Sequence, residues 1–235
     1  MGIPFYFASL IRSHRGITRP VKERADVDVL GVDFNCLIHR YIDETNPIQS
    51  VVDAFAHILD AYCRPKHLLI AMDGLVPYAK IVQQRYRRMR IKEDEAGVFD
   101  RNQISPGTPY MKELEHALAE RFPYAVISGT QEPGEGEHKL FTMLRRIPRS
   151  DRKDVCIYGL DADLILICLQ HAHEADTMSL LRESGEFNDP KLETAEFSTL
   201  LISTLQTIIP IPVDQYVALS ILCFGNDFMP ALGMF

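Results

Sequence analysis

Short apolar segments alternate with longer amphipathic segments along most of this 235-residue chain. A bounded apolar run of about four to eight residues is typical of a strand buried on both faces. Strands that alternate with helices build a mostly parallel sheet with helices on both sides. We therefore predict an α/β fold with a mostly parallel sheet flanked by helices. The predicted strands span residues 27–34, 67–74, 124–129, 154–158 and 177–183.

The segments between these strands have helical spacing and recognisable starts. Thr108 is a suitable N-cap with Pro109 behind it, and Pro77 falls near the first turn of another helix. The length fits one domain of ordinary upper size, so we predict a single domain over 1–235 with a helical C-terminal part from about residue 190. The predicted helices span 50–62, 77–96, 108–122, 136–147, the segment ending at 169, 194–208 and 213–224.

The composition is that of a folded protein, with 46% hydrophobic residues. No apolar run approaches the roughly 20 residues that span a bilayer, so no membrane partner is expected. The five cysteines form no CxxC pair and most have apolar neighbours, which predicts reduced thiols in a reducing compartment. We therefore expect a cytoplasmic protein, with the nucleus and a virus particle as alternatives.

Acidic residues recur where the predicted strands end. Because the carboxyl ends of parallel strands meet at one edge of a sheet, acids far apart in the sequence converge there. A single acid at such a place is usually a turn or cap residue, but seven together are difficult to explain in that way. We predict a shared metal site made of Asp33, Asp73, Glu135, Glu137, Asp161, Asp163 and Asp227.

Clustered carboxylates repel one another unless a cation lies between them. A site of oxygen ligands, without histidine or cysteine spacing, favours Mg²⁺ over Zn²⁺, with Mn²⁺ as the alternative. Two such ions about 3.5–4 Å apart are common machinery for hydrolysis of phosphodiesters. A net charge of −7 therefore does not argue strongly against a nucleic-acid substrate, since the metal-binding acids contribute to it.

The stretch PGEGEHK, residues 133–139, places two of these acids beside two glycines. Residues two apart point to different sides of a regular helix. We therefore expect Glu135 in the entry turn and Glu137 on the first helical turn, so that both face one metal pair. Gly134 and Gly136 would permit the turn and leave room for phosphate.

A basic helix face follows the second predicted strand. Lys80, Gln84, Arg87 and Arg88 are spaced by four, three and one, which places them on one face, close to Asp73. This spacing predicts a phosphate-binding face, the alternative being a solvated surface. His39 follows Asp33 by six residues and is either a structural residue or a stacking partner for a base.

Eight segments occur in a fixed order along the chain: MGIPFYF, GVDFNCLIH, MDGLVPYAKIVQQRYRRMR, ISPGTPYM, PGEGEHK, YGLDADLI, LLRE and GNDFMP. Together they closely resemble the first conserved region of the Xrn-type 5′→3′ exoribonuclease family, over nearly the whole chain. The resemblance implies a PIN/flap-nuclease-like fold and a single nuclease domain. It also implies Mg²⁺-dependent, two-metal removal of nucleotides from single-stranded RNA that carries a 5′-monophosphate.

The resemblance implies roles for individual residues as well. The seven acids named above fall on the family's metal-binding residues. His39 falls on its base-stacking histidine. The 5′-phosphate pocket, sized for one phosphate, corresponds to Lys80, Gln84, Arg87 and Arg88.

The chain is much shorter than the family's enzymes and is more similar in this respect to compact homologues in large DNA viruses. It ends eight residues after Asp227, and the family's second conserved region, which resembles a lid over the active site, has no counterpart in it. We therefore expect a partner protein to complete the lid. Two other functions stay open: a flap-type DNA nuclease, and a nuclease-fold binding or assembly module without activity.

Overall fold

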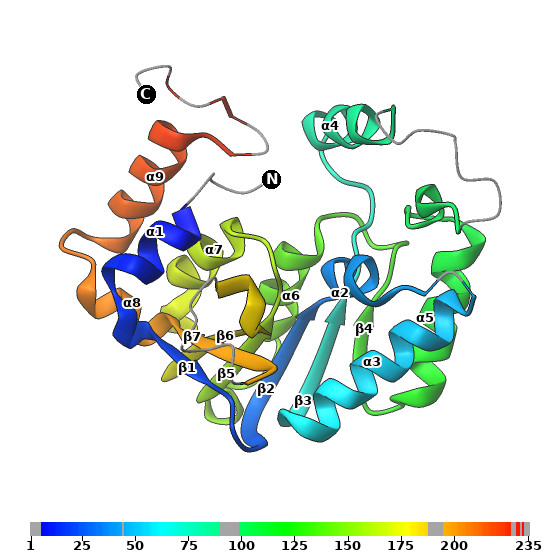
Figure 1. Ribbon diagram of the computed structural model, residues 1–235, viewed down its shortest axis with the longest axis horizontal. Helices are drawn as coiled ribbons and strands as arrows, with labels where there is room; N and C mark the ends of the chain where they lie inside the picture. The colour runs from blue at the N-terminus through cyan, green and yellow to red at the C-terminus, as the bar shows by residue number, and fades with distance from the viewer. Residues whose placement is uncertain are drawn as a thin grey trace.

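The computed structural model of the chain describes residues 6–43, 45–89, 99–187, 195–226, 229–230 and 232. At its centre is a seven-stranded sheet in the order β1-β7-β6-β5-β2-β3-β4 (Figure 1). The strands from β6 to β4 are parallel, and β7 runs antiparallel to both β6 and β1, so the predicted mostly parallel sheet is confirmed. The strands are β1 Thr18–Pro20, β2 Ala25–Asp33, β3 Cys63–Ala71, β4 Val126–Ser128, β5 Asp154–Tyr158, β6 Thr177–Glu183 and β7 Phe197–Leu201.

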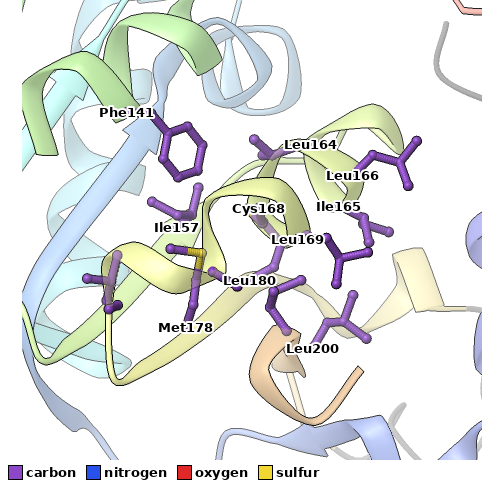
Figure 2. Close-up of a cluster of buried hydrophobic side chains, with 14 of the residues drawn as sticks. Phe141, Ile157, Leu164, Ile165, Leu166, Cys168, Leu169, Met178, Leu180 and Leu200 are labelled. Carbon is purple, nitrogen blue, oxygen red and sulfur yellow. The ribbon is translucent and has the colours of Figure 1, made fainter. Parts of the chain in front are cut away.

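Helices cover both faces of the sheet, as the sequence predicts (Figure 1). One hydrophobic cluster joins α2, α3 and α5 to one face, and a second joins α1, α6, α7, α8 and α9 to the other. Figure 2 shows the second cluster, to which Phe141 of α6, Leu164 of α7 and Ile157 of β5 belong. The helices are α1 Tyr6–Ser13, α2 Phe34–Tyr41, α3 Pro47–Ala61, α4 Tyr78–Met89, α5 Pro109–Arg121, α6 Gly136–Leu144, α7 Asp163–His171, α8 Ile202–Ile208 and α9 Val213–Phe224.

Strand β2 is the point at which the chain changes direction across the sheet. From β2 the chain passes through α2 and α3 to β3 on one side, and β5 later pairs with β2 on the other side. Ligands of open α/β sheets bind in the crevice outside the carboxyl ends of strands at such a switch point. The last residue of β2, Asp33, therefore lies at the favoured position for a functional site.

The predicted helix over 194–208 is wrong in its first half. Residues 197–201 form strand β7, which pairs with β6 and β1, and helix α8 begins only at Ile202. Phe197 contacts the core on one face of the sheet and Leu200 the core on the other, an alternation that a helix cannot give. The open edge of β6 offers a full row of backbone partners, which outweighs the helical spacing of the apolar residues.

Other predicted elements have shifted ends. Strand β3 ends at Ala71, so Asp73 lies beyond it, and the helix predicted over 77–96 is seen as α4, with residues 90–98 outside the described part. The sequence reasoning did not predict α1, α2 or β1. In the described part of the chain no single helix could cross a membrane. Only α8 and α9 taken together, bent by 89° at their junction, reach the necessary length and composition.

Candidate metal centre

The edge of the sheet that carries the predicted metal acids, at the carboxyl ends of β2, β3 and β5, is called the acidic edge below. Asp33, on the central strand β2, lies in the middle of it. It is both the last residue of β2 and the N-cap of α2, and it is only 5% exposed. Burial raises the pKa of the Asp33 carboxyl well above its usual range, and the charges of Asp73 and Asp161 add to the increase. A buried carboxylate among other acids is stable in its charged form only when a cation accompanies it.

Three of the predicted acids come together here. One carboxylate oxygen each of Asp33, Glu137 and Asp161 lies within 4.8 Å of the other two. Two oxygens on opposite sides of one Mg²⁺ ion are ~4.2 Å apart, because each bond is about 2.1 Å long. A small approach of these side chains would therefore let all three bind one ion. The donor set consists of carboxylate oxygens alone, which suits a hard cation.

The two glutamates of PGEGEHK lie as the sequence predicts. Glu135 is the N-cap of α6 and Glu137 is in its first turn, and both side chains are buried. Burial raises the pKa of Glu137 well above its usual range, and the charges of Asp163 and Asp33 add to the increase. The N-terminus of α6 carries a partial positive charge, which favours two acids at this position.

Asp73 is held by hydrogen bonds to two other segments. Its N–H donates to Oδ1 of Asn35 at 3.0 Å, and its own Oδ1 accepts from the N–H of Gly136 at 2.8 Å. Burial raises the pKa of Asp73, although the bond from Gly136 opposes the shift. Asp73 therefore joins α2, the end of β3 and the start of α6, through its backbone N–H to α2 and through its carboxylate to α6.

Gly136 permits the close approach of these acids. A Cβ atom at this position would lie 2.8 Å from Oδ1 of Asp33 and 3.1 Å from the carbonyl oxygen of Ala71. Its neighbour Gly134 has a φ of 111°, in the left-handed region that favours glycine. Gly134 thus serves the turn, as expected, while the missing side chain of Gly136 leaves space for carboxylates.

Lys80, predicted to bind phosphate, contacts one of the acids. Its Nζ lies 3.1 Å from Oε2 of Glu135, and both side chains are buried. Lys80 is the first charged residue of α4, so this ion pair fixes the start of the basic helix at the acidic edge. The sequence placed Lys80 near the metal acids but did not predict that it contacts Glu135.

The remaining predicted residues are spread around the edge. Gln84 lies half-buried one turn along α4 from Lys80, and His39 is exposed on α2. Asp163 is the first residue of α7 and is half-buried. The backbone of α4 includes Arg87 and Arg88, whose side chains lie outside the described part of the structure, as does Asp227.

Lys139 is a buried residue that the sequence reasoning missed. Its Nζ donates to the carbonyl oxygens of Met72 at 2.8 Å, Gly129 at 2.7 Å and Glu132 at 3.1 Å. An ammonium group has three donors, so this arrangement uses all of them. Burial lowers the pKa of Lys139. The group fastens the backbone before Asp73 to the loop that precedes Glu135. The lysine of PGEGEHK was the available signal, because a lysine in a buried helix start needs partners.

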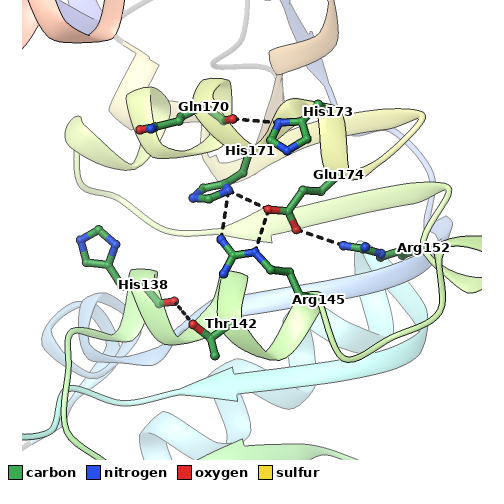
Figure 3. A network of polar contacts seen from close by, with 8 residues as sticks. All are labelled: His138, Thr142, Arg145, Arg152, Gln170, His171, His173 and Glu174. Atoms are coloured by element: carbon green, nitrogen blue, oxygen red, sulfur yellow. Dashed lines mark hydrogen bonds and ion pairs between the residues drawn. The ribbon is translucent and has the colours of Figure 1, made fainter. Parts of the chain in front are cut away.

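A second buried acid lies at the far end of α6 and α7. Glu174 accepts from Arg145 Nε at 3.1 Å and Arg152 Nη1 at 3.0 Å, and it contacts His171 Nδ1 at 2.8 Å (Figure 3). Burial alone would raise the pKa of Glu174, but the bonds to His171 and Arg145 outweigh it and lower the pKa. The His171 ring also stacks on Phe141, with the ring centroids 4.3 Å apart. This network joins α6 to α7 and includes none of the predicted metal acids.

The fold is of the PIN/flap-nuclease type. The catalytic core of Rad2 in complex with a DNA substrate aligns with 97% of this chain and 64% of its own, with a TM-score of 0.57 and 17% identity. Flap endonuclease-1 from Methanococcus jannaschii aligns with 100% of this chain and 74% of its own, with a TM-score of 0.54 and 14% identity. At these identities the likeness concerns the fold.

The sequence defines the family more closely. Residues 1–97 and 90–184 match the family described as XRN 5'-3' exonuclease N-terminus, and the chain belongs to this family. It is 27% identical to 5'-3' exoribonuclease 1 of Saccharomyces cerevisiae over 99% of its length, and 32% identical to 5'-3' exoribonuclease 2 of Eremothecium gossypii over 78%. The chain spans 19% of the yeast relative and 27% of the Eremothecium relative.

Proposed function

We propose that this chain is a metal-dependent 5′→3′ exoribonuclease that hydrolyses single-stranded RNA carrying a 5′-monophosphate. The observation that carries the proposal is the approach of Asp33, Glu137 and Asp161 to within 4.8 Å at the switch point of the sheet. Family membership supports the reaction, since the relatives are named 5'-3' exoribonucleases.

We propose Mg²⁺ as the natural ion, because the acids offer oxygen ligands alone, and Mn²⁺ as a substitute. Asp33, Glu137 and Asp161 would hold the first ion. A second ion would be held by Asp73, Glu135, Asp163 and Asp227. When bound, two such ions supply an activated water and stabilise the leaving oxygen of a phosphodiester.

The chain's own residues would orient the RNA around this centre. Lys80 is already buried beside Glu135, so its ammonium group stands where a phosphate would need positive charge. Gln84, Arg87 and Arg88 continue the same face of α4 and would complete a pocket for the terminal phosphate. His39, exposed on α2, would stack on the first base.

We also propose that a partner protein covers the site. Leu75, in the segment between Asp73 and α4, and Tyr78, the first residue of α4, support this proposal, because they are 70% and 80% exposed. Large apolar side chains in such positions are common in binding surfaces.

The proposal is tested with RNA labelled at the 3′ end that carries a 5′-hydroxyl, a 5′-monophosphate or a 5′-triphosphate. We expect progressive shortening of the monophosphate RNA in Mg²⁺, none in EDTA, and none with the Asp161→Ala variant. A matched control is Asp176→Ala, which removes an exposed acid bound to Arg149 and should leave the rate unchanged. Equal activity of the wild-type chain and Asp161→Ala would exclude this site.

A flap-type DNA nuclease is the second candidate, because Rad2 and flap endonuclease-1 share the fold. Flapped DNA and the monophosphate RNA, compared at equal concentration, separate the two activities. Faster cleavage of the DNA would favour the second candidate. A folded chain that cleaves neither substrate at any Mg²⁺ or Mn²⁺ concentration would be a binding module.

A further inference from the structure

The end of strand β6 carries two charged residues that lie inside the protein. Arg182 and Glu183, from the LLRE segment, are 2% and 5% exposed. Burying an arginine and an acid in a core is unfavourable unless both are bonded, and it contributes little to stability even then. Their place beside the acidic edge calls for another explanation.

Adjacent residues of a strand face opposite sides of the sheet. Leu180 belongs to the core beneath α6 and α7, whereas Leu181 belongs to the core beneath α2 and α3. By this alternation Arg182 faces the α7 side and Glu183 faces the α2 side. The two side chains therefore reach the acidic edge from opposite faces of the sheet.

Arg182 contacts the turn that carries one of the proposed metal ligands. Its Nη2 donates to the backbone carbonyl oxygen of Asp161 at 3.2 Å. Asp161 lies between β5 and α7 in a short turn. The guanidinium group thus holds the backbone of this turn while leaving the Asp161 carboxylate free to bind a cation.

Glu183 contacts the helix that carries His39. Its Oε1 accepts from the hydroxyl of Tyr41 at 2.6 Å and from the hydroxyl of Tyr158 at 2.8 Å. Tyr41 is the last residue of α2, and Tyr158 is the last residue of β5. A single carboxylate oxygen therefore joins α2 to the strand that leads to Asp161.

The second oxygen of Glu183 shows that packing alone does not account for this acid. Oε2 is buried, and within the described residues it has no hydrogen-bond partner. Such a group is destabilising, so a structural role alone would favour an apolar residue. Beside it, Arg40 of α2 bonds to Glu186 at 2.9 Å, so the end of α2 is held twice.

We propose that Arg182 and Glu183 are positioning residues that set the metal ligands and α2, the helix that carries His39, at a fixed separation. Arg182 acts on the metal side through the Asp161 turn. Glu183 acts on the RNA side through Tyr41 and α2, which carries His39. This inference rests on the proposed function, and it assigns the two residues separable effects.

The test uses a hydroxyl deletion that leaves the ring of Tyr41 in place, and a change of Arg182 that keeps its positive charge. Tyr41→Phe should raise KM for monophosphate RNA about tenfold, with kcat and the Mg²⁺ activation midpoint nearly unchanged. Arg182→Lys should lower kcat about tenfold and raise the Mg²⁺ midpoint, with KM nearly unchanged. Tyr62→Phe is the matched control, because its hydroxyl bonds to the exposed Glu196 and not to Glu183 or to the Asp161 turn. It should change none of the three.

The proposal is overturned if Tyr41→Phe behaves like Tyr62→Phe, or if both site variants change KM, kcat and the midpoint in the same way. If Arg182→Lys does not fold, Arg182→Gln replaces it, because its side-chain amide keeps a donor, and it should lower kcat without raising KM.

Binding measurements separate this proposal from the proposed function. RNA binding in Ca²⁺, followed by fluorescence anisotropy, should weaken in Tyr41→Phe alone, and Mg²⁺ binding, followed by calorimetry, should weaken in Arg182→Lys alone. A wild-type chain that binds RNA and Mg²⁺ without cleaving would overturn the nuclease function and leave these differences as the test of positioning. A wild-type chain that binds neither would overturn both proposals.

Discussion

Two buried acidic sites at opposite ends of α6 differ in how their charge is compensated. Glu174 is bonded to Arg145, Arg152 and His171, and the bonds to His171 and Arg145 lower its pKa. At the other end the pKa of Glu137 is raised, with burial as the largest cause. The same side chain type, equally buried, is thus stabilised in one place and destabilised in the other.

The difference indicates a structural role for the site around Glu174 and a ligand-binding role for the acidic edge. Near Glu174 the chain supplies the positive charge itself, so this acid is balanced by Arg145 and Arg152. At the acidic edge Lys80 contacts Glu135, while carboxylate oxygens of Asp33, Glu137 and Asp161 lie within 4.8 Å of one another. Acids held this close together, with the pKa values of Asp33 and Glu137 raised, are typical of a place that binds a ligand.

The largest effect is expected from neutralising an acid at the metal centre. Glu137→Gln should lower kcat/KM for monophosphate RNA by about a thousandfold, equivalent to about 4 kcal/mol of transition-state stabilisation. Glu174→Gln is the comparison, and its activity per folded molecule should equal that of the wild type. Activity is measured at saturating Mg²⁺. Equal losses in both variants would remove the distinction between the two sites.

The next largest effect is on stability, and here the substitution of Glu174 should cost more than the substitution of Glu137. Glu174→Gln should lower the free energy of unfolding by about 3 kcal/mol, because two arginines lose their buried partner. Glu137→Gln should not lower the stability of the metal-free protein, since it removes a repelling charge. Urea titrations of both variants measure the difference. Glu196→Gln, at an exposed acid, should change stability little and serves as the control.

The acidic edge should also make the stability of the metal-free protein depend on pH. The raised pKa values of Asp33 and Glu137 mean that the folded chain holds protons which the unfolded chain has released. Stability of the metal-free protein should therefore fall as pH rises from about 4 towards those raised values. Thermal unfolding between pH 5 and 8 measures this slope. It should flatten in Glu137→Gln and in wild type with Mg²⁺. An unchanged slope in both cases would contradict the prediction.

The smallest effect is expected from a single methyl group. Gly136→Ala places a Cβ atom against Asp33 and should reduce activity about tenfold, since the acids must move apart. Gly16→Ala is the matched control, because nothing lies within 4 Å of its Cβ position. Activity and Mg²⁺ midpoint are compared for the two variants. Retained activity in Gly136→Ala would mean that the acids tolerate a wider spacing.

Local patterns predicted much of this arrangement. Acids after apolar runs located Asp33, Asp161 and the two glutamates, because parallel strands bring their ends together whatever lies between them. The spacing within PGEGEHK placed Glu135 and Glu137 correctly around the start of α6.

What the sequence did not predict depends on tertiary partners. Strand β7 forms because β6 and β1 offer hydrogen bonds, which its own residues do not reveal. The contact between Lys80 and Glu135, and that between Arg182 and Asp161, join residues 55 and 21 positions apart. The positions of charged residues in the sequence do not determine which groups a buried lysine or arginine contacts in the fold.

The position of Asp33 at the last residue of β2 has a consequence for folding. In the native register Val32 pairs with Ile70 and Tyr158, and Asp33 pairs with Ala71. A slip of one residue would bring an apolar side chain to the place of this carboxylate. A cation that binds only the native edge would therefore stabilise the native strand register relative to shifted registers, by about 2.7 kcal/mol when its concentration is a hundred times its Kd. Metal binding would then favour the native register of the sheet during folding, in addition to its role in the reaction.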